Sequence, residues 1–196
     1  VTVTTISVAR AAHTVSVVQT SGTPTIVGVV MEDTASSGIM YLSAGQGGLS
    51  LTAPTAQAWA NWTTVLASVQ PDVLTFEMKE GSSTLAADLD AFLTATQAGC
   101  SCDVVLIQST PTAGTFDADQ VAQHLIVRAK AAQYGVLTWD SYTPFKDYAT
   151  LTALGFNGDG THVTTACDIF RGDLMMRDLG VLDEAIYSGR DVIAGQ

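Results

Sequence analysis

The segment that decides the fold is Asp103-Val-Val-Leu-Ile-Gln108, a short run of branched apolar residues with a polar residue at each end. Such a run predicts a strand that is buried on both faces. Helical spacing flanks it on either side, over Thr84 to Ala98 and over Asp117 to Gln133. The inward face of the first of these helices is formed by Leu85, Leu89, Phe92 and Leu93. Strand and helix in alternation predict a parallel sheet with helices on both faces, a three-layer α/β fold.

The same strand–helix unit continues in both directions along the chain. Asp72 to Met78 predicts another buried strand, and Pro54 to Val69 predicts a helix before it. Downstream the expected elements are a strand over Val136 to Trp139, a helix over Pro144 to Leu154 and a closing helix over Thr164 to Leu179. Trp62 and Trp139 fall at core-facing positions of these elements, which favours packing over a role as a sugar platform.

The first forty residues have a different pattern. Val1 to Val8, Thr14 to Gln19 and Thr25 to Met31 are rich in β-branched residues and are separated by turn residues, so they predict a β-meander or β-sandwich portion. We therefore expect three parts: a β portion over 1–37, the α/β domain over 38–180 and a C-terminal tail over 181–196.

Charge and hydropathy exclude several classes of function. Eight basic residues against nineteen acidic ones give a net charge of −11, and the basic residues are scattered, so a nucleic-acid backbone would be repelled. The sequence has no uninterrupted apolar run of about eighteen residues, so no membrane insertion is expected. With 47% hydrophobic and only 14% charged residues, the chain is expected to fold rather than to be disordered.

The three cysteines are Cys100, Cys102 and Cys167. A disulfide between Cys100 and Cys102 would close a very small, strained ring, so all three are expected to be buried thiols. A metal site built on Cys-x-Cys and one distant Cys would lack a fourth ligand nearby in the sequence, so we expect neither a metal nor a cofactor.

Two loops carry residues suited to catalysis. Gly45 to Gly48 would let backbone N–H groups approach an oxyanion, although such a turn also arises from packing alone. Asp159 stands three residues before His162 in a glycine-rich loop, so its carboxylate could orient the imidazole as a general base. A surface histidine with ordinary partners, or one that caps the last helix, fits this spacing equally well.

Taken together and in this order, these segments resemble the SGNH (GDSL-type) hydrolase superfamily, which has a flavodoxin-like sheet. Ser43-Ala-Gly-Gln-Gly-Gly48 is similar to the Gly block, with Gly48 at the oxyanion position, and Asp159-Gly-Thr-His162 is similar to the last catalytic block. Pro71 to Met78 is similar to the strand that leads into the third block. The resemblance extends over about Gly28 to Gly180.

The departures from the family pattern concern the catalytic groups. Gly81 stands where the family has the Asn that donates to the oxyanion, and the sequence contains no Gly-Asp-Ser nucleophile block. Thr34 is the nearest imitation, but only fourteen residues separate it from Gly48, too few for a crossover helix. The resemblance therefore implies that Asp159 and His162 are a relic pair. Glu77 and Glu80 could form the carboxylate pair of a glycosidase, but solvated charges on a degraded loop are the favoured interpretation.

The residues from Val27 to Tyr41 resemble the end of a β-sandwich insert found in tail-associated SGNH-type proteins of actinobacterial phages. On this resemblance the Ser block lies upstream of Val1, in a segment removed or carried elsewhere. It implies a non-catalytic structural or binding protein of a virion, on the tail or the capsid surface, or otherwise a secreted, soluble protein. Its partners would be other virion proteins in an oligomeric assembly or a cell-surface glycan.

Two other functions stay open at this point. One is a serine esterase or carbohydrate deacetylase whose nucleophile comes from an upstream segment or a partner chain. The other is a carbohydrate-binding module that uses the β-sandwich portion. His13 and His124 are expected to be polar surface groups.

Overall fold

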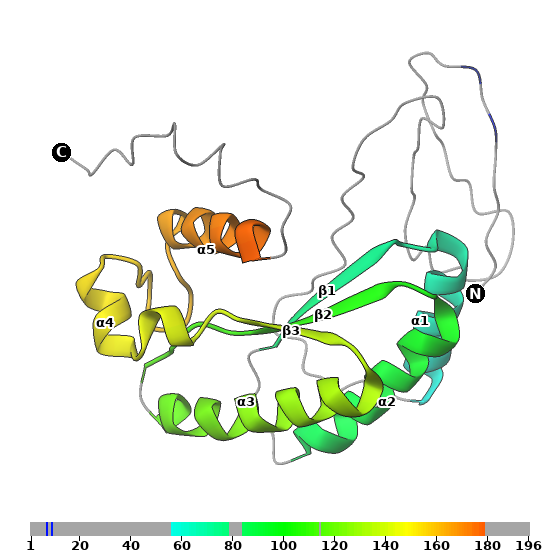
Figure 1. Ribbon diagram of the computed structural model, residues 1–196, viewed down its shortest axis with the longest axis horizontal. Helices are drawn as coiled ribbons and strands as arrows, with labels where there is room; N and C mark the ends of the chain where they lie inside the picture. The colour runs from blue at the N-terminus through cyan, green and yellow to red at the C-terminus, as the bar shows by residue number, and fades with distance from the viewer. Residues whose placement is uncertain (1–6, 8, 10–55, 79–83, 114, 179–196) are drawn as a thin grey trace, which may run out of the picture. The chain divides into compact units, whose positions relative to one another are not determined.

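The computed structural model describes residues 7, 9, 56–78, 84–113 and 115–178. The chain divides into two compact units, Thr2–Gly48 and the remainder, and every element below belongs to the second. The helices are α1 (Ala56–Val69), α2 (Leu85–Gly99), α3 (Thr115–Tyr134), α4 (Tyr148–Ala153), α5 (Thr165–Asp178) and the short 3-10 helix η1 (Thr143–Phe145). The strands are β1 (Val73–Met78), β2 (Asp103–Gln108) and β3 (Leu137–Asp140) (Figure 1). The expected β-meander lies outside the described residues.

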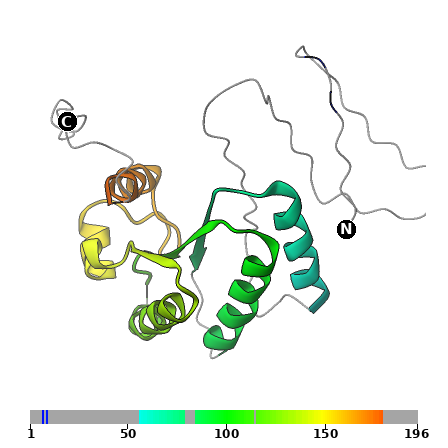
Figure 2. The ribbon, with the colours of Figure 1, turned by 45° about the vertical axis from the view of Figure 1, so that its right-hand side comes forward.

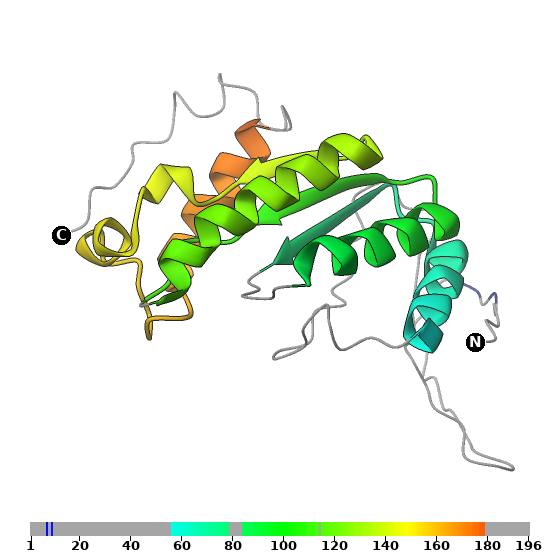
Figure 3. The ribbon, with the colours of Figure 1, turned by 90° about the horizontal axis from the view of Figure 1, so that it is seen from below.

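The three strands form a parallel sheet in the order β1-β2-β3, which confirms the general α/β class. Asp103 pairs with Val73 on one side of β2, and Val105 pairs with Leu137 on the other. The strands run in the same direction and therefore end at the same edge of the sheet (Figure 3). That edge is where open α/β sheets bind ligands.

The larger core lies between the sheet and helices α2 and α3, which are drawn below the strands in Figure 1. Val104 and Leu106 of β2 contribute to it from the sheet, and the expected inward residues of α2 are all buried. Phe92 stacks on Phe76 of β1 with 4.3 Å between ring centroids. The apolar residues of α2 thus recur at helical spacing because one face of the helix covers the sheet.

The opposite face of the sheet is covered by α5. Val105, Ile107 and Trp139 are buried there against Leu174 and Met175. Strand β2 is therefore buried on both faces, as its composition predicts. Trp139 is only 6% exposed, which confirms its expected packing role.

The expectation that Asp72 to Met78 forms a buried strand is wrong for one of its two faces. Leu74 and Phe76 pack against the larger core, but Val73 is 53% exposed, and Thr75 and Glu77 are exposed as well. These three alternate residues lie on the α5 side of the sheet, because side chains of a strand alternate between its faces. Within the described residues, the apolar side chains of α5 pack on β2 and β3, and α5 contacts β1 through the ion pair of Arg171 with Glu77.

The single helix expected over Pro144 to Leu154 is also wrong. The segment is divided into η1 and α4, because Lys146 has a φ of 64°, which a continuous right-handed helix cannot contain. Asp147 begins α4 as its cap, and its side chain accepts a hydrogen bond from the Thr150 N–H at 2.7 Å. That backbone N–H holds the pKa of Asp147 below its ordinary value.

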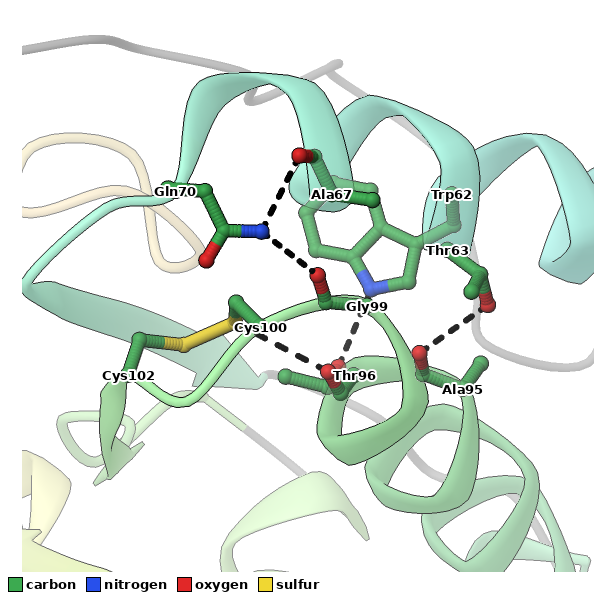
Figure 4. Close-up of a disulfide and its surroundings, with 9 residues drawn as sticks. All are labelled: Trp62, Thr63, Ala67, Gln70, Ala95, Thr96, Gly99, Cys100 and Cys102. Atoms are coloured by element: carbon green, nitrogen blue, oxygen red, sulfur yellow. Dashed lines mark hydrogen bonds between the residues drawn. A yellow bond between two sulfur atoms is a disulfide. The ribbon is translucent and has the colours of Figure 1, made fainter.

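Helix α1 packs on α2 rather than on the sheet, and Figure 2 shows the two helices side by side. Trp62 Nε1 donates a hydrogen bond to Thr96 Oγ1 at 3.0 Å, and Thr63 Oγ1 donates to the Ala95 carbonyl at 3.0 Å. Trp62 also packs against the larger core, as expected. The helices approach closely at Gly99, which Figure 4 shows near Thr63. An added Cβ at Gly99 would lie 2.8 Å from both Leu66 Cβ and the Thr63 carbonyl oxygen.

Replacing Gly99 by alanine is expected to lower the free energy of unfolding by about 1–3 kcal/mol, because the new methyl group overlaps backbone as well as side-chain atoms. Gly172 in α5 is the matched control, since an added Cβ meets nothing within 4 Å there. Gly172→Ala should instead raise stability by about 0.5–1 kcal/mol through helix propensity. Urea denaturation of both variants tests the pair, and equal stabilities would contradict the close approach of α1 and α2.

The expectation that all three cysteines are free thiols is wrong for two of them. Cys100 and Cys102 form a disulfide, and Cys167 is free and buried, as expected for that residue. The bridge is possible because the Cα atoms are 5.3 Å apart, inside the usual range for bonded cysteines. A ring closed over one intervening residue removes little chain entropy, so the bridge contributes less than about 2 kcal/mol to stability by the loop model.

Candidate functional site

The sequence-predicted pair Asp159 and His162 lies in the loop between α4 and α5. An antiparallel bridge between Asn157 and Val163 closes the loop at its base. Inside it, the Gly158 N–H donates to the His162 carbonyl at 2.8 Å, and the Gly160 N–H donates to Asn157 Oδ1 at 2.7 Å. The loop is therefore held by its own backbone, which places the two side chains close to each other.

The Asp159 carboxylate orients the His162 ring. Asp159 Oδ2 lies 2.8 Å from His162 Nδ1, and Oδ1 accepts hydrogen bonds from the N–H groups of Thr161 and His162 at 2.9 and 2.7 Å. These hydrogen bonds hold the pKa of Asp159 far below its ordinary value. The bond to the His162 ring has the largest effect, and the two backbone bonds have smaller ones. Because the carboxylate is ionised, Nδ1 carries the proton of this bond and Nε2 is the nitrogen that could act as a base.

This geometry predicts an acid dependence of stability. The depressed pKa of Asp159 means that its stabilising contribution is present above the unfolded value of 3.8 and is lost as the pH falls through the folded pKa. The melting temperature of wild type should therefore exceed that of Asp159→Asn at about pH 5–7. We expect the difference to shrink steadily in more acidic buffer, as measured by circular dichroism. A difference that stays constant into strong acid would contradict the pairing.

The Asp159–His162 loop lies beside the carboxyl edge of the sheet. The Ala113 N–H, from the loop after β2, donates to the Gly160 carbonyl at 3.0 Å. Both side chains are exposed, with 60% of Asp159 and 78% of His162 accessible. The last helix does not use His162 as its cap, because Thr164 performs that role: its carbonyl accepts from the Asp168 N–H, and its hydroxyl accepts from the Cys167 N–H. The capping alternative for His162 is thus excluded.

No serine or threonine hydroxyl is bonded to the His162 ring within the part of the chain that the structure describes. Gly48, predicted for the oxyanion position, lies outside the described residues, as do Thr34, Glu80 and Gly81. Among residues 56–78, 84–113 and 115–178, no group of acidic, histidine and cysteine side chains could hold a metal ion. Across these same ranges, none of the helices has the length and apolarity to cross a membrane.

Sequence reasoning missed a second polar cluster at the same edge, on the α5 face. Arg171 is buried, and its Nη2 donates to Glu77 Oε1 at 2.6 Å and to Ser141 Oγ at 3.3 Å. Its Nη1 lies 3.3 Å from Asp168 Oδ1. Glu77 is therefore the ion-pair partner of a buried arginine on α5. Its side chain is 43% exposed, as expected of a solvated charge, but it lies in β1, so its expected place in a loop is wrong. The only local signal was a basic residue one turn after Cys167 in an acidic chain.

Gln120 of α3 forms a network of hydrogen bonds with the buried loop after β2, which sequence reasoning also missed. Gln120 Oε1 accepts from the N–H and hydroxyl of Thr112 at 3.0 and 3.2 Å. Its Nε2 donates to Ser109 Oγ at 3.0 Å and to the Thr110 carbonyl at 2.9 Å. By contrast, the carboxamide of Gln108 is equally buried but has no partner for either polar atom among the described residues. Because Gln120 bonds to three residues of the loop after β2, it holds the path of that loop, whose Ala113 contacts the Asp159–His162 loop.

His124 is not the surface group that the sequence suggested. It is half-buried and meets Tyr142 edge to face, with 4.8 Å between ring centroids. Burial lowers the pKa of His124, Asp140 opposes this effect, and Arg128 adds to it. The ring is thus a packing group between α3 and the segment after β3.

Comparisons of the chain with protein-family models, with curated proteins and with solved structures found no match. The assignment of a function therefore rests on the sequence and on the geometry of the Asp159–His162 pair and its surroundings.

Proposed function

We propose that this chain is a non-catalytic relative of the SGNH hydrolases that serves as a structural or binding protein of a virion, on a phage tail or capsid surface. The observation that carries the proposal is the state of His162: its ring is oriented by Asp159, yet no hydroxyl of the described residues meets it. The replacement of the oxyanion Asn by Gly81 and the lack of a Gly-Asp-Ser block point the same way. The strand order β1-β2-β3 is compatible with the last strands of such a sheet.

An oriented imidazole without a nucleophile has little to catalyse. A general base must lie within about 2.6–3.2 Å of the proton that it removes. The His162 side chain is 78% exposed, and its Nε2 has no hydrogen-bond partner among the described residues. The carboxylate of Asp159 then serves the loop, because it satisfies two backbone N–H groups and one ring nitrogen.

Hydrolysis of p-nitrophenyl acetate tests this proposal. We expect wild type and His162→Ala to give the same rate, no faster than free imidazole at the same concentration. Asp159→Asn is the matched control, since it keeps the ring but removes its orientation. Turnover by wild type that His162→Ala abolishes would overturn the non-catalytic assignment.

A second function is favoured by one specific observation, the complete Asp159–His162 hydrogen bond of 2.8 Å beside the carboxyl edge of the sheet. In this case the protein is a serine esterase or carbohydrate deacetylase, and the nucleophile comes from an upstream segment or a partner chain. A fluorophosphonate probe applied to the native assembly distinguishes the two functions. Labelling of a serine that depends on His162 supports the enzyme, and a lack of labelling supports the structural protein.

The location and partners follow from the same proposal. In an extracellular particle the Cys100–Cys102 bridge is expected in its oxidised state, because disulfides persist most readily in an oxidising setting. The acidic chain would contact other virion proteins in an oligomer or a neutral cell-surface glycan, and not nucleic acid. Sedimentation velocity of the purified full chain should therefore show an assembly larger than the 20.4 kDa monomer.

A further inference from the structure

The disulfide lies at the junction of α2 and β2, on the opposite edge of the sheet from the Asp159–His162 pair. Cys100 follows the last residue of α2, and Cys102 precedes the first residue of β2 (Figure 4). The two residues differ in access: Cys100 is 9% exposed, whereas Cys102 is only partly buried, with one side packed against the larger core, and is preceded along the chain by the exposed Ser101. An external thiolate can therefore reach the Cys102 sulfur more readily than the Cys100 sulfur.

The surroundings of Cys100 suit both oxidation states. The Thr96 carbonyl accepts the Cys100 N–H at 3.0 Å, which closes the last turn of α2. The same carbonyl oxygen lies 3.7 Å from Cys100 Sγ, in a geometry that an S–H donor would use. In the disulfide that proton is absent, so a reduced Cys100 would gain an acceptor that is already in place. The closed bridge also contributes little chain-entropy stabilisation, because it spans a single residue.

The last turn of α2 is also the surface on which α1 docks. Gln70 Nε2 donates to the Gly99 carbonyl at 3.2 Å, directly before Cys100, and Trp62 Nε1 donates to Thr96 Oγ1 at 3.0 Å. Figure 4 shows these bonds and the bridge around one helical turn. A change in the conformation of Cys100 therefore acts on the contacts that hold α1.

We propose that Cys100 and Cys102 form a thiol–disulfide exchange site for a small thiol of the glutathione class, and that its state controls the docking of α1. A glutathione thiolate attacks Cys102 Sγ, the S–S bond breaks, and Cys100 leaves as a thiolate that takes up a proton. A second glutathione thiolate attacks the mixed disulfide and releases the Cys102 thiol. Two glutathione molecules are oxidised to one glutathione disulfide, and the two cysteines are reduced.

Thiol counting tests the exchange step in the full chain. After alkylation in denaturant, intact mass should show one free thiol, Cys167, in oxidised glutathione, and all three thiols in reduced glutathione. Three thiols in oxidised glutathione, or a bridge that survives reduced glutathione, would overturn the site. The order of attack has its own test: oxidised glutathione should form a stable mixed disulfide with Cys102 in Cys100→Ser, with release of one glutathione thiol, and far less with Cys100 in Cys102→Ser. Equal labelling of both variants would contradict attack at Cys102.

Hydrogen exchange read by mass spectrometry tests the control of α1. Reduction should raise amide exchange in peptides from the second half of α1 several-fold, and Cys102→Ser should show the same rise in oxidised glutathione. Peptides from α5 serve as the internal control and should not change. If α1 exchanges equally in all of these states, the bridge does not control its docking and that part of the proposal fails.

Discussion

Gln120→Leu is expected to lower the free energy of unfolding by about 3 kcal/mol or more, because several buried groups lose their partner at once. The change leaves the Thr112 N–H and the Thr110 carbonyl without their side-chain partner, along with two hydroxyls. Unpaired buried backbone groups each cost about 1–3 kcal/mol. Since the same loop contacts Gly160 through Ala113, the His162 ring signals should also shift in an NMR spectrum of the variant.

Gln108→Leu is the matched control for this prediction. The two glutamines are 1% and 3% exposed, and they receive the same substitution, but the carboxamide of Gln108 has no partner in the described part of the chain. Removing it should leave stability unchanged or raise it, because no hydrogen bond is lost. Urea denaturation of both variants decides the matter, and a Gln108→Leu variant as unstable as Gln120→Leu would show that the amide has a partner that contributes to folding.

Glu77→Gln is expected to lower the free energy of unfolding by about 2–3 kcal/mol, below the range for a fully buried pair because Glu77 is partly exposed. Only 11% of the Arg171 side chain is accessible, so its charge cannot turn to water when the carboxylate is removed. Asp168 remains as a partner, but at 3.3 Å and with 60% of its side chain exposed, so it compensates weakly.

Arg171→Met removes the other member of the same ion pair and is compared with Glu77→Gln. It should cost less, because the carboxylate that it leaves behind is 43% exposed and can be hydrated. The double variant should cost less than the sum of the two single variants, since the buried charge and its counter-ion disappear together. Thermal and urea unfolding of the three variants measure this cycle. If Arg171→Met proves the more damaging of the two, the guanidinium contributes mainly by packing and not through its charge.

These two clusters explain why the carboxyl edge of the sheet holds its shape. Gln120 determines the loop after β2, and Arg171 ties α5 to β1 and to Ser141 beyond β3. The Asp159–His162 loop lies between α4 and α5 and contacts the first of these regions through Ala113. Loss of either cluster should therefore disturb the candidate site without touching its two residues.

Most of the described secondary structure could be predicted from local pattern. The apolar run Asp103 to Gln108, the helical spacing from Leu85 to Leu93 and the cap glycine Gly135, with a φ of 66°, depend on neighbours a few residues away. The predictions that failed concern features that do not recur at regular spacing along the sequence. Lys146 adopts a positive φ that no propensity scale anticipates, and Val73 of β1 is 53% exposed because, among the described residues, the apolar side chains of α5 pack on β2 and β3.

The candidate site divides in the same way. The spacing of Asp159 and His162 was enough to place them together, because both belong to one short loop whose backbone bonds are local. The pairing of Glu77 with Arg171 joins residues 94 positions apart, and no spacing rule connects them. The same holds for Trp62 and Thr96, which meet only because α1 packs against α2.

The sequence by itself determined that this chain alternates strands and helices, that Asp103 to Gln108 is a strand buried on both faces and that Asp159 can orient His162, since each depends on short-range periodicity or on a single loop. Tertiary structure alone decided which strands the apolar side chains of α5 cover, which carboxylate holds Arg171 and how Gln120 shapes the edge beside the pair. The physical reason is that burial and ion pairing depend on which distant surfaces meet, and a linear pattern does not encode that meeting.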